Sequence, residues 1–328
     1  MSDPVWLTER DVVDLMSLPQ AIDALKAGLR LQASGGALPM SKTHVAWDGH
    51  TLHALGAAVP GAGIVGTKTW AHTAGGATPL LVLWDAETGA LAAVIEAFAL
   101  GQMRTGSMSG LATHIMAAPQ ADTMAIIGTG KQAITQVAAV AAVRPLKTVR
   151  VFSPTRKNRE AFAERLQQAD LPLEIEVADS LAAATFGASI ITLATRAKEP
   201  FLEARMISPG AHINAIGAIT PEREEVHQDV FARCSVLAAD DVAATRRLSR
   251  EFSTYFGDDN AAWQAVTPIS GLVDGWQRPA DAKLTLFKAM GMGISDLALG
   301  IDLHKKAKTE GRGRPIPLPE RAPVRLTA

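Results

Sequence analysis

The length, composition and charge of the chain exclude several classes of protein. Its 328 residues are 48% hydrophobic and 20% charged, which is typical of a globular protein with room for two domains. A formal net charge of −1 offers neither the basic surface that binds nucleic acid nor a polybasic membrane anchor. The single cysteine, Cys234, excludes an internal disulfide, and Asp3 stands where a signal peptide would be basic. These features predict a cytoplasmic protein with no membrane or nucleic-acid partner.

The first third of the chain predicts a helix followed by a mostly antiparallel sheet. Helical spacing of apolar residues runs from Asp11 to about Ala33, with a break at Leu18-Pro19. Five strand-like segments separated by glycines follow, and they are Thr43–Trp47, Thr51–Ala58, Gly63–Trp70, Leu80–Asp85 and Ala90–Glu96. Asp85–Gly89 is expected to be a hairpin connection. A further helix is expected from about Met103 to Met116.

The segment from Asp122 to Lys157 predicts a dinucleotide-binding unit. An apolar strand, Thr123–Ile127, leads into a G-x-G-x-x-A turn, an alanine-rich helix and a second strand, Thr148–Phe152. In such a turn the glycines allow a pyrophosphate to approach the backbone, and the helix N-terminus offers free N–H groups to it. The alternative is a tight turn that binds nothing, but the complete strand, turn and helix favour a cofactor site. The expected contacts are Gly128, Thr129, Gly130, Lys131, Gln132 and Ala133.

The end of the second strand indicates which dinucleotide is preferred. NAD sites usually place a carboxylate there for the ribose hydroxyls, but here no acid occurs before Glu160. Hydroxyl groups and cations suit a 2′-phosphate, so Ser153, Thr155, Arg156 and Lys157 favour NADP(H), with NAD(H) as the alternative cofactor. Arg156 and Lys157 could instead belong to a solvated loop.

Beyond this unit the pattern alternates between helix and strand, as in a doubly wound fold. Helices are expected at Asn158–Gln168 and Ser180–Ala184, and strands at Leu173–Val177, Ser189–Leu193, Ala211–Ile216 and Val236–Ala239. Ligands of such sheets bind at the carboxyl ends of the strands, where the polar residues are Thr192, Thr195, Asn214, Asp240 and Asp241. Cys234 is expected in a buried strand, and residues 311–328 in an extended tail.

These motifs resemble the ornithine cyclodeaminase/μ-crystallin family of NAD(P)-dependent enzymes. The specific part is the motif that begins Arg104-Thr105, upstream of the glycine turn, and the other matching segments are Gly66–Lys68, Leu83–Gly89, Ile127–Ala133, Gly210–Ala218 and Thr285–Asp296. The resemblance implies a Rossmann-type, doubly wound nucleotide-binding domain at residues 118–301. A smaller α+β domain for substrate binding and dimerisation would comprise residues 1–117, completed by residues 302–328. The expected assembly is a homodimer.

The resemblance also implies roles for individual residues. Arg104 matches the arginine that binds the substrate carboxylate, and Lys42 matches, more loosely, a second cation for it. Lys68 matches a lysine beside the reacting carbon, where a lowered pKa would let it donate or accept a proton. Without the resemblance, Arg104 and Lys68 would be interpreted as solvated charges. Asp296 matches an acid near the nicotinamide, the alternative being a helix N-cap. Further cofactor contacts are expected from Thr105 and Thr195.

Two segments depart from the family pattern. Ornithine-cyclising members carry an aspartate after a Gly-Ala pair to handle the substrate amine, but Ile219 occupies that place here. An apolar side chain can neither stabilise an ammonium group nor remove its proton, so ornithine cyclodeaminase activity is not favoured. After Lys68 the chain lacks the asparagine-proline stretch of many relatives and contains His72, which is either a substrate contact or a structural histidine.

The sequence therefore predicts an NAD(P)H-dependent oxidoreductase that acts on small imino, amino or keto acids. The favoured reaction is reduction of a ketimine or cyclic imine carboxylate, with hydride passing between nicotinamide C4 and the substrate α-carbon. The alternatives are an amino-acid dehydrogenase of the alanine dehydrogenase kind, an ornithine or lysine cyclodeaminase, and a non-catalytic binding protein of the crystallin kind. No metal is expected, because no His, Cys or Asp cluster has the spacing of a metal site.

Overall fold

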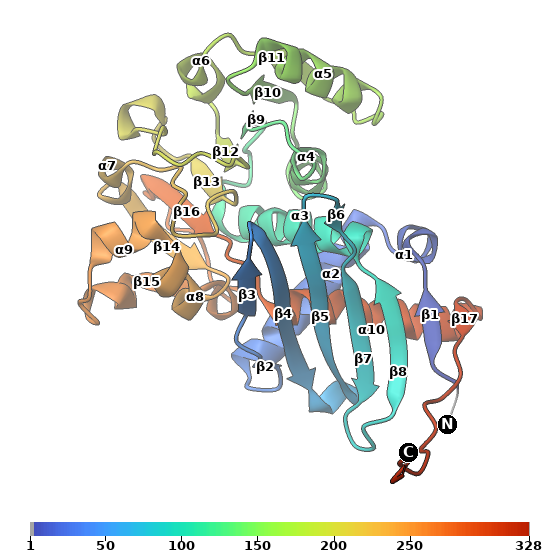
Figure 1. Ribbon diagram of the computed structural model, residues 1–328. Coiled ribbons are helices and arrows are strands. Elements are labelled where there is room, and N and C mark those ends of the chain that lie inside the picture. Colours follow the sequence, from blue (N-terminus) through green and yellow to red (C-terminus); the bar gives the residue numbers. More distant parts are fainter. Residues whose placement is uncertain (1–2, 328) are drawn as a thin grey trace.

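The computed structural model describes residues 3–327, which form two sheets with helices packed between and around them (Figure 1). The first, called the N-terminal sheet below, has nine mostly antiparallel strands. The second, called the parallel sheet, has eight strands that all run in one direction. This arrangement confirms the predicted α/β fold, with a doubly wound sheet and a smaller α+β part.

The N-terminal sheet contains β1 (Val5–Leu7), β2 (Leu38–Pro39), β3 (Thr43–Trp47), β4 (His50–Val59), β5 (Ile64–Thr73), β6 (Gly76–Ala77), β7 (Leu80–Asp85), β8 (Leu91–Glu96) and β17 (Arg314–Pro315). The strand order is β17-β1-β8-β7-β5-β4-β2, with β3 paired to β4 and β6 paired to β5. The five expected strands are confirmed with small shifts of their ends, and Asp85–Gly89 connects β7 to β8 as expected. A short 3₁₀ turn, η1 (Pro60–Ala62), joins β4 to β5.

Four helices share a hydrophobic core with this sheet: α1 (Glu9–Leu15), α2 (Leu18–Ala33), α3 (Phe98–Met116) and α10 (Gly293–Glu310). The break expected at Leu18-Pro19 lies slightly earlier, at Met16-Ser17, and Leu18 and Pro19 open α2. Ser17 caps α2 by accepting the N–H of Gln20. In Figure 1, α3 lies between the two sheets, while α2 and α10 lie behind the N-terminal strands. The helices thus connect the two halves of the molecule.

Helix α3 begins at Phe98, earlier than the expected start near Met103. The carboxylate of Glu9 accepts the N–H groups of Phe98 (2.6 Å) and Ala99 (2.7 Å) and thereby caps the helix. Because this cap comes from the start of the chain, local sequence could not indicate it. The additional turns place Arg104 in the interior of α3.

The parallel sheet contains β9 (Thr123–Ile127), β10 (Thr148–Phe152), β11 (Glu174–Val177), β12 (Ile190–Leu193), β13 (His212–Ala215), β14 (Cys234–Ala239), β15 (Val266–Pro268) and β16 (Leu284–Lys288). Its order is β11-β10-β9-β12-β13-β16-β14-β15. The remaining helices are α4 (Ala133–Ala141), α5 (Arg156–Gln167), α6 (Leu181–Thr185), α7 (Gln228–Phe231), α8 (Val242–Leu248) and α9 (Arg250–Phe256), and the 3₁₀ turns are η2 (Ala204–Met206), η3 (Ala262–Ala265) and η4 (Ile269–Leu272).

Strand β16 was not predicted, although it lies in the middle of the parallel sheet. It pairs with β13 on one side and β14 on the other, and all five of its residues are buried. One of them is Lys288, and a charged residue in the middle of the sheet breaks the apolar pattern by which a buried strand is recognised.

Cys234 begins a strand, β14, as expected, but its side chain is partly exposed. Desolvation of its thiol still raises the pKa of that thiol to about 12.

Helix α10 returns to the N-terminal sheet directly after β16 and contacts β4, β5 and β7. It approaches so closely that a Cβ atom on Gly293 would collide with the backbone of Gly56. The helix begins upstream of residue 302, so we propose that the segment completing the N-terminal domain starts at Gly293. In the part of the chain that the structure describes, no helix is both long and apolar enough to cross a membrane.

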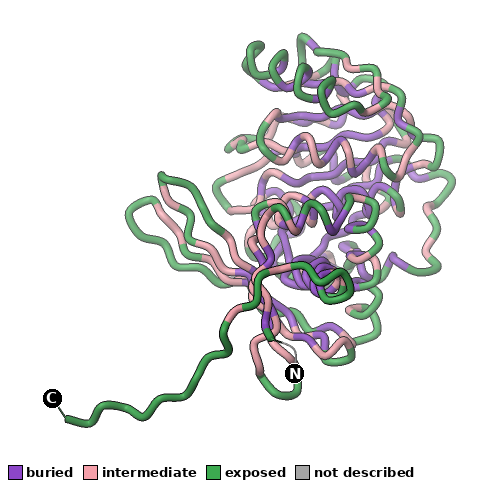
Figure 2. The backbone as a smooth tube through the Cα atoms, turned by 90° about the vertical axis from the view of Figure 1, so that its right-hand side faces the viewer, coloured by how far each residue is buried: buried purple, intermediate pink, exposed green. Residues whose placement is uncertain are grey.

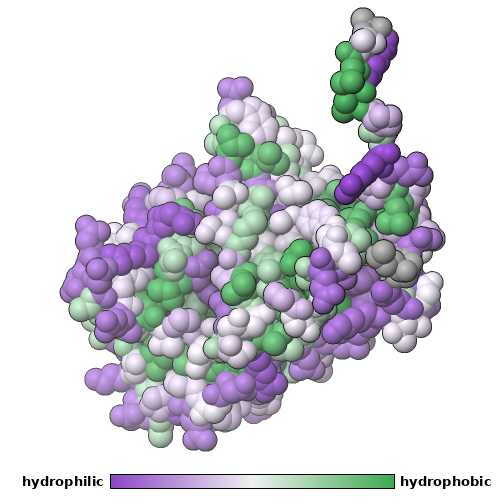
Figure 3. Space-filling model, turned by 90° about the horizontal axis from the view of Figure 1, so that it is seen from below, coloured by the Kyte–Doolittle hydropathy of each residue, from purple (hydrophilic) through white to green (hydrophobic). Residues whose placement is uncertain are grey.

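The C-terminal segment is extended, as expected, apart from the short β17 that pairs with β1. Beyond Ile316, whose N–H donates to the carbonyl of Pro4, it leaves the body of the protein and is exposed along its length (Figure 2). Figure 3 shows the same segment standing clear of the surface, with hydrophobic residues near its end. The last residue, Ala328, lies outside the described residues, as do Met1 and Ser2.

Candidate active site

The glycine turn lies between β9 and α4, in the geometry that a dinucleotide needs. Gly128 has a φ of 105°, and a Cβ atom there would come within 2.5 Å of the carbonyl oxygen of Ala194. The space beside Gly130 is open, because a Cβ atom added there would meet no heavy atom within 4 Å. Ala133 is fully buried at the start of α4, which has no side-chain cap on its first N–H groups. The turn therefore fits a pyrophosphate.

The other residues expected at the turn have different surroundings. Lys131 is exposed, and its Nζ lies 5.7 Å from the ring centroid of Phe98. Gln132 is partly buried, and its Oε1 is a buried acceptor without a hydrogen-bond partner within the protein. The hydroxyl of Thr105 donates to the carbonyl of Gly101 (2.8 Å), one turn earlier in α3. Among these side chains, Gln132 has the clearest unused hydrogen-bonding capacity.

The segment after β10 is a short loop, Ser153 to Thr155, that leads into the first turn of α5. The hydroxyl of Ser153 accepts from Thr129 (3.4 Å) and donates to the carbonyl of Thr155 (3.4 Å), the N-cap residue of α5. Arg156 and Lys157 are exposed helix residues, and Arg156 pairs with Glu160 at 2.8 Å. The Glu160 carboxylate raises the pKa of Arg156. Exposed pairs of this kind are weak, so Arg156 can exchange Glu160 for a bound phosphate.

Lys68, Arg104 and Asp296 come together from β5, α3 and α10. Lys68 Nζ lies 2.5 Å from Asp296 Oδ1, and Arg104 Nε lies 3.5 Å from the same oxygen. Lys68 is 4% exposed and Asp296 1% exposed. Asp296 is not the N-cap of α10, a position that Met292 occupies. Because Asp296 Oδ2 and Arg104 Nε are buried without hydrogen-bond partners, the cluster retains polar capacity for a ligand.

The environment of Lys68 prepares its amine for proton transfer. Burial lowers the pKa of Lys68 to about 8, even though the neighbouring Asp296 carboxylate raises it, and Arg104 lowers it further. At that pKa both forms of the amine are populated near neutral pH. Lys68 can therefore act either as an acid or as a base.

Lys42 and His72 are placed differently with respect to this cluster. Lys42 is half-buried, and its pKa is lowered by burial and by the charge of Arg104, so it lies in the electric field of the cluster. His72 shares a face of β5 with Lys68 but is exposed near the end of the strand. Of these two side chains, Lys42 is the less exposed.

A row of stacked rings beside Lys68 was not predicted. The Trp70 ring centroid lies 5.2 Å from Lys68 Nζ, and the ring stacks on His53 (4.8 Å between centroids), which stacks on His44 (5.5 Å). Strand register aligns the three rings across β3, β4 and β5. Burial lowers the pKa of His53 to about 4, with a smaller contribution from Lys42, so this ring is neutral at neutral pH. Trp70 follows Lys68 with the period of a strand, which was the available signal.

Asp240, a predicted rim residue, holds the loop between β16 and α10. Its carboxylate accepts the N–H groups of Met290 (2.7 Å) and Gly291 (2.8 Å), and burial raises its pKa. Gly291 is packed against Arg104, since a Cβ atom on it would lie 3.2 Å from Nη1. The carboxyl edge of the parallel sheet is therefore in contact with the Lys68, Arg104 and Asp296 cluster.

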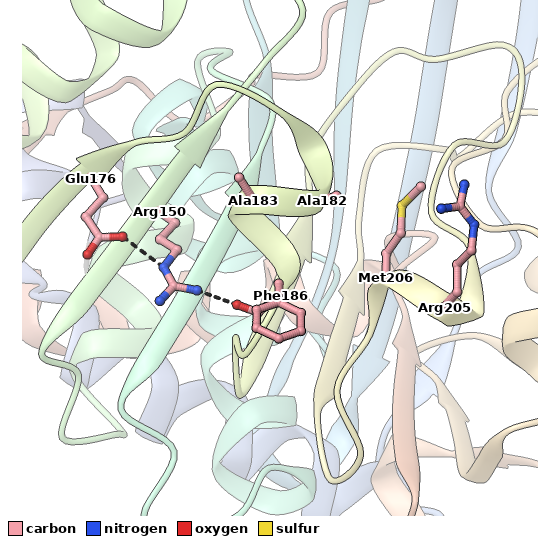
Figure 4. Close-up of a pocket in the computed structure, with 7 residues that line it drawn as sticks. All are labelled: Arg150, Glu176, Ala182, Ala183, Phe186, Arg205 and Met206. Atoms are coloured by element: carbon pink, nitrogen blue, oxygen red, sulfur yellow. Dashed lines mark hydrogen bonds and ion pairs between the residues drawn. The ribbon is translucent and has the colours of Figure 1, made fainter.

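A surface pocket of about 550 Å³ lies elsewhere, between β10, α6 and η2 (Figure 4). In it Arg150 donates to Glu176 and to the carbonyl of Phe186. None of the predicted site residues lines this pocket. Within residues 3–327, no group of three or more His, Cys, Asp or Glu side chains is arranged to hold a metal ion.

The chain matches a known protein family along nearly its whole length. Residues 2–311 match the ornithine cyclodeaminase/mu-crystallin family. Ketimine reductase mu-crystallin from Mus musculus is 33% identical over 218 residues, which cover 66% of this chain and 66% of that protein. Alanine dehydrogenase from Archaeoglobus fulgidus is 25% identical over 323 residues, which cover 94% of this chain and 97% of that protein.

A solved structure also resembles this chain along nearly its whole length. The structure of Thermococcus litoralis Δ1-pyrroline-2-carboxylate reductase in complex with NADH and L-proline has a TM-score of 0.88 at 25% identity, covering 95% of this chain and 100% of that chain. The relatives are thus named as two reductases and a dehydrogenase. The mouse alignment spans just under two thirds of that protein, but the family match spans nearly all of this chain. The chain therefore belongs to the ornithine cyclodeaminase/mu-crystallin family.

Proposed function

We propose that the protein is an NAD(P)H-dependent oxidoreductase that reduces the C=N bond of a small imino acid, or oxidises the corresponding α-amino acid. The observation that carries this proposal is the buried Lys68–Asp296 pair beside Arg104, at the carboxyl edge of the parallel sheet. A proton donor, a carboxylate-binding cation and a dinucleotide turn are the groups that such a reaction requires. The relatives named as imine reductases support the same reaction.

The cofactor would bind across the carboxyl ends of the parallel strands. The backbone of Gly128 and Gly130 and the start of α4 would hold the pyrophosphate. When bound, a reduced nicotinamide supplies the hydride of the reaction. We propose a preference for NADP(H) over NAD(H). Arg156 pairs with Glu160 only as an exposed ion pair on the helix surface, so Arg156 and Lys157 both remain available to a 2′-phosphate, beside the hydroxyls of Ser153 and Thr155.

The side chains of the cluster would divide the remaining work. Arg104, assisted by Lys42, binds the substrate carboxylate and so orients the C=N bond. As the α-carbon gains hydride, the π electrons of the bond move to nitrogen, and protonated Lys68 supplies the proton of the new N–H bond. Asp296 accepts a hydrogen bond from Lys68 and holds its amine in place. In the reverse reaction neutral Lys68 removes that proton.

The proposed substrate is a ketimine or a cyclic imine carboxylate. Ile219 cannot bind a side-chain ammonium, which argues against ornithine cyclisation. Trp70 provides a flat apolar surface next to Lys68, which suits a cyclic imine. His72 is proposed as an outer contact only, because it is exposed at the end of β5.

An amino-acid dehydrogenase of the alanine dehydrogenase kind is the second candidate. The alignment with the Archaeoglobus fulgidus enzyme favours it, since it covers 97% of that protein. This reaction differs from the first in using free ammonia. Reduction of pyruvate that depends on ammonium would support it.

We also propose that the protein is a homodimer. Val45 and Leu52 pair across β3 and β4 on the face opposite to the stacked rings, and they are 57% and 45% exposed. A second copy would bury these apolar side chains. Light scattering of the purified protein tests this proposal, and Val45→Asp should weaken the dimer.

One assay tests the proposed function. Oxidation of NADPH and NADH would be followed by absorbance with Δ1-pyrroline-2-carboxylate, Δ1-piperideine-2-carboxylate, and pyruvate with ammonium or methylamine. We expect turnover of a cyclic imine, with NADPH as the better reductant. Cofactor binding without turnover of any substrate would contradict an enzymatic role and favour a binding protein.

A further inference from the structure

A buried carboxylate joins two loops at the carboxyl edge of the parallel sheet. Glu225 is 0% exposed, and its Oε1 accepts from the N–H (2.8 Å) and hydroxyl (2.7 Å) of Thr195, after β12. Its Oε2 accepts the N–H groups of Gly217 (2.9 Å) and Ala218 (3.1 Å), after β13. Each oxygen thus holds one loop. The hydroxyl of Thr195, expected to contact the cofactor, is engaged by Glu225 instead.

A second buried pair holds Glu225 in position. The Oε2 atom of Glu251 accepts the N–H groups of Glu225 (2.9 Å) and Val226 (3.1 Å), and its Oε1 lies 2.6 Å from Lys288 Nζ. Glu251 and Lys288 are both 0% exposed. Because Lys288 ends β16, the network connects the ends of β12, β13 and β16. These residues are called the Glu225 network below.

Stability alone is a poor explanation for this network. Moving each ion from water into a protein interior costs several kcal/mol, and well-packed apolar residues often serve stability equally well. Burial raises the pKa of Glu225, because the protein interior disfavours the charged form of its carboxyl group. A network that is expensive to bury but saturated with hydrogen bonds is suited to fixing the geometry of the loops it joins.

The position of these loops relates them to one half of the cofactor. The strand order reverses between β9 and β12, and dinucleotides lie across such a reversal. The glycine turn and Ser153 follow β9 and β10, so the adenosine half belongs on that side. The nicotinamide half then lies over β12, β13 and β16, the three strands that the Glu225 network connects.

We propose that Glu225 is a positioning residue for the nicotinamide half of the cofactor site, with Glu251 and Lys288 holding it in place. This inference rests on the proposed function, because it requires a nicotinamide dinucleotide. Glu225 itself faces the two loops and acts through them. Its removal should therefore affect the two halves of the cofactor differently.

The test compares Glu225→Gln with the wild-type protein. An amide has an acceptor on only one side, so its NH₂ group would face either Thr195 or the Gly217 and Ala218 amides, and one loop would be released. The matched control is Glu224→Gln, which removes a neighbouring carboxylate that pairs with Arg250 at 3.0 Å instead of with the loops. Thermal unfolding of both variants establishes that binding is measured on folded protein.

Affinity for the reduced dinucleotide and for ADP, which carries the adenosine and the pyrophosphate but not the nicotinamide ribose, would be measured by calorimetry. For Glu225→Gln we expect binding of NADPH or NADH to weaken by about tenfold or more, and binding of ADP by less than about twofold. Glu224→Gln should change neither. Equal losses for both ligands, or no loss, would overturn the inference. If the wild-type protein binds neither ligand, the proposed function fails and the inference fails with it.

A second measurement needs no variant and applies even if Glu225→Gln does not fold. Hydrogen–deuterium exchange of the ligand-free wild-type protein should show slow exchange in the peptide containing Gly217 and Ala218, because Glu225 already holds their amides. Rapid exchange that becomes slow only when the dinucleotide is added would mean that the cofactor orders these loops. That result would overturn a positioning role for Glu225.

Discussion

Two buried lysine–carboxylate pairs lie at the carboxyl edge of the parallel sheet, and they differ in what surrounds them. Lys288 and Glu251 are 2.6 Å apart, and both oxygens of Glu251 are used by protein donors. Lys68 and Asp296 are 2.5 Å apart, but Asp296 Oδ2 has no hydrogen-bond partner, and neither does the nearby Arg104 Nε. Lys288 and Glu251, called the saturated pair, are suited to support the neighbouring loops. Lys68 and Asp296, called the open pair, are suited to bind a substrate and react with it.

Replacing the lysine of the open pair should have the largest effect on activity. In Lys68→Met the proton donor is lost, and we expect kcat to fall by about 10²–10⁴-fold. Asp296 is not left alone, because Arg104 remains at 3.5 Å, so the fold and the affinity for cofactor should be kept. Steady-state kinetics and a cofactor titration check both parts. Unchanged kcat would remove Lys68 from the mechanism.

The matching change in the saturated pair should affect stability most. Lys288→Met leaves Glu251 buried without its cation, which should lower the free energy of unfolding by about 3–5 kcal/mol. Urea denaturation measures this. Neutralising both partners, in Lys288→Met with Glu251→Gln, should recover part of the loss. A fully stable Lys288→Met protein would show that the two pairs do not differ as described.

The pH dependence of the reaction should report the open pair. With the pKa of Lys68 at about 8, imine reduction should fall as pH rises above 8, because the proton donor is lost, and amine oxidation should rise over the same range. Asp296 raises this pKa, so Asp296→Asn should move the midpoint to lower pH. Profiles of kcat/KM against pH test this. A midpoint that does not move would separate the profile from Lys68.

The smallest expected effect concerns the ring beside the open pair. Trp70→Leu removes the flat surface 5.2 Å from Lys68 Nζ and should lower kcat/KM for a cyclic imine, relative to an acyclic one, by roughly tenfold. Trp276→Leu, in the partly buried segment between η4 and β16, is the control and should leave the ratio unchanged. The same shift in both variants would remove Trp70 from substrate selection.

Local patterns were sufficient to predict one half of the site and much of the fold. The glycine turn depends on neighbours in sequence, so Gly128 and its strand could be predicted, as could the alternating strands of the N-terminal sheet. The contact between Lys68 and Asp296 joins positions 228 residues apart, and only the family resemblance indicated both. Charged side chains such as Glu225 and Lys288 usually lie at the protein surface, so their burial could not be predicted from the composition of the chain or from the spacing of its apolar residues.

Three of the proposed reacting groups are carried by elements that share one core. β5, α3 and α10 supply Lys68, Arg104 and Asp296 and belong with the N-terminal sheet, whereas the glycine turn belongs to the other sheet. The same core also takes in Ala238 and Phe287 of the parallel sheet, and Gly291, whose N–H is held by Asp240, packs against Arg104. The acid–base groups and the hydride donor are therefore mechanically coupled, and a mutation on either side of this contact can alter both.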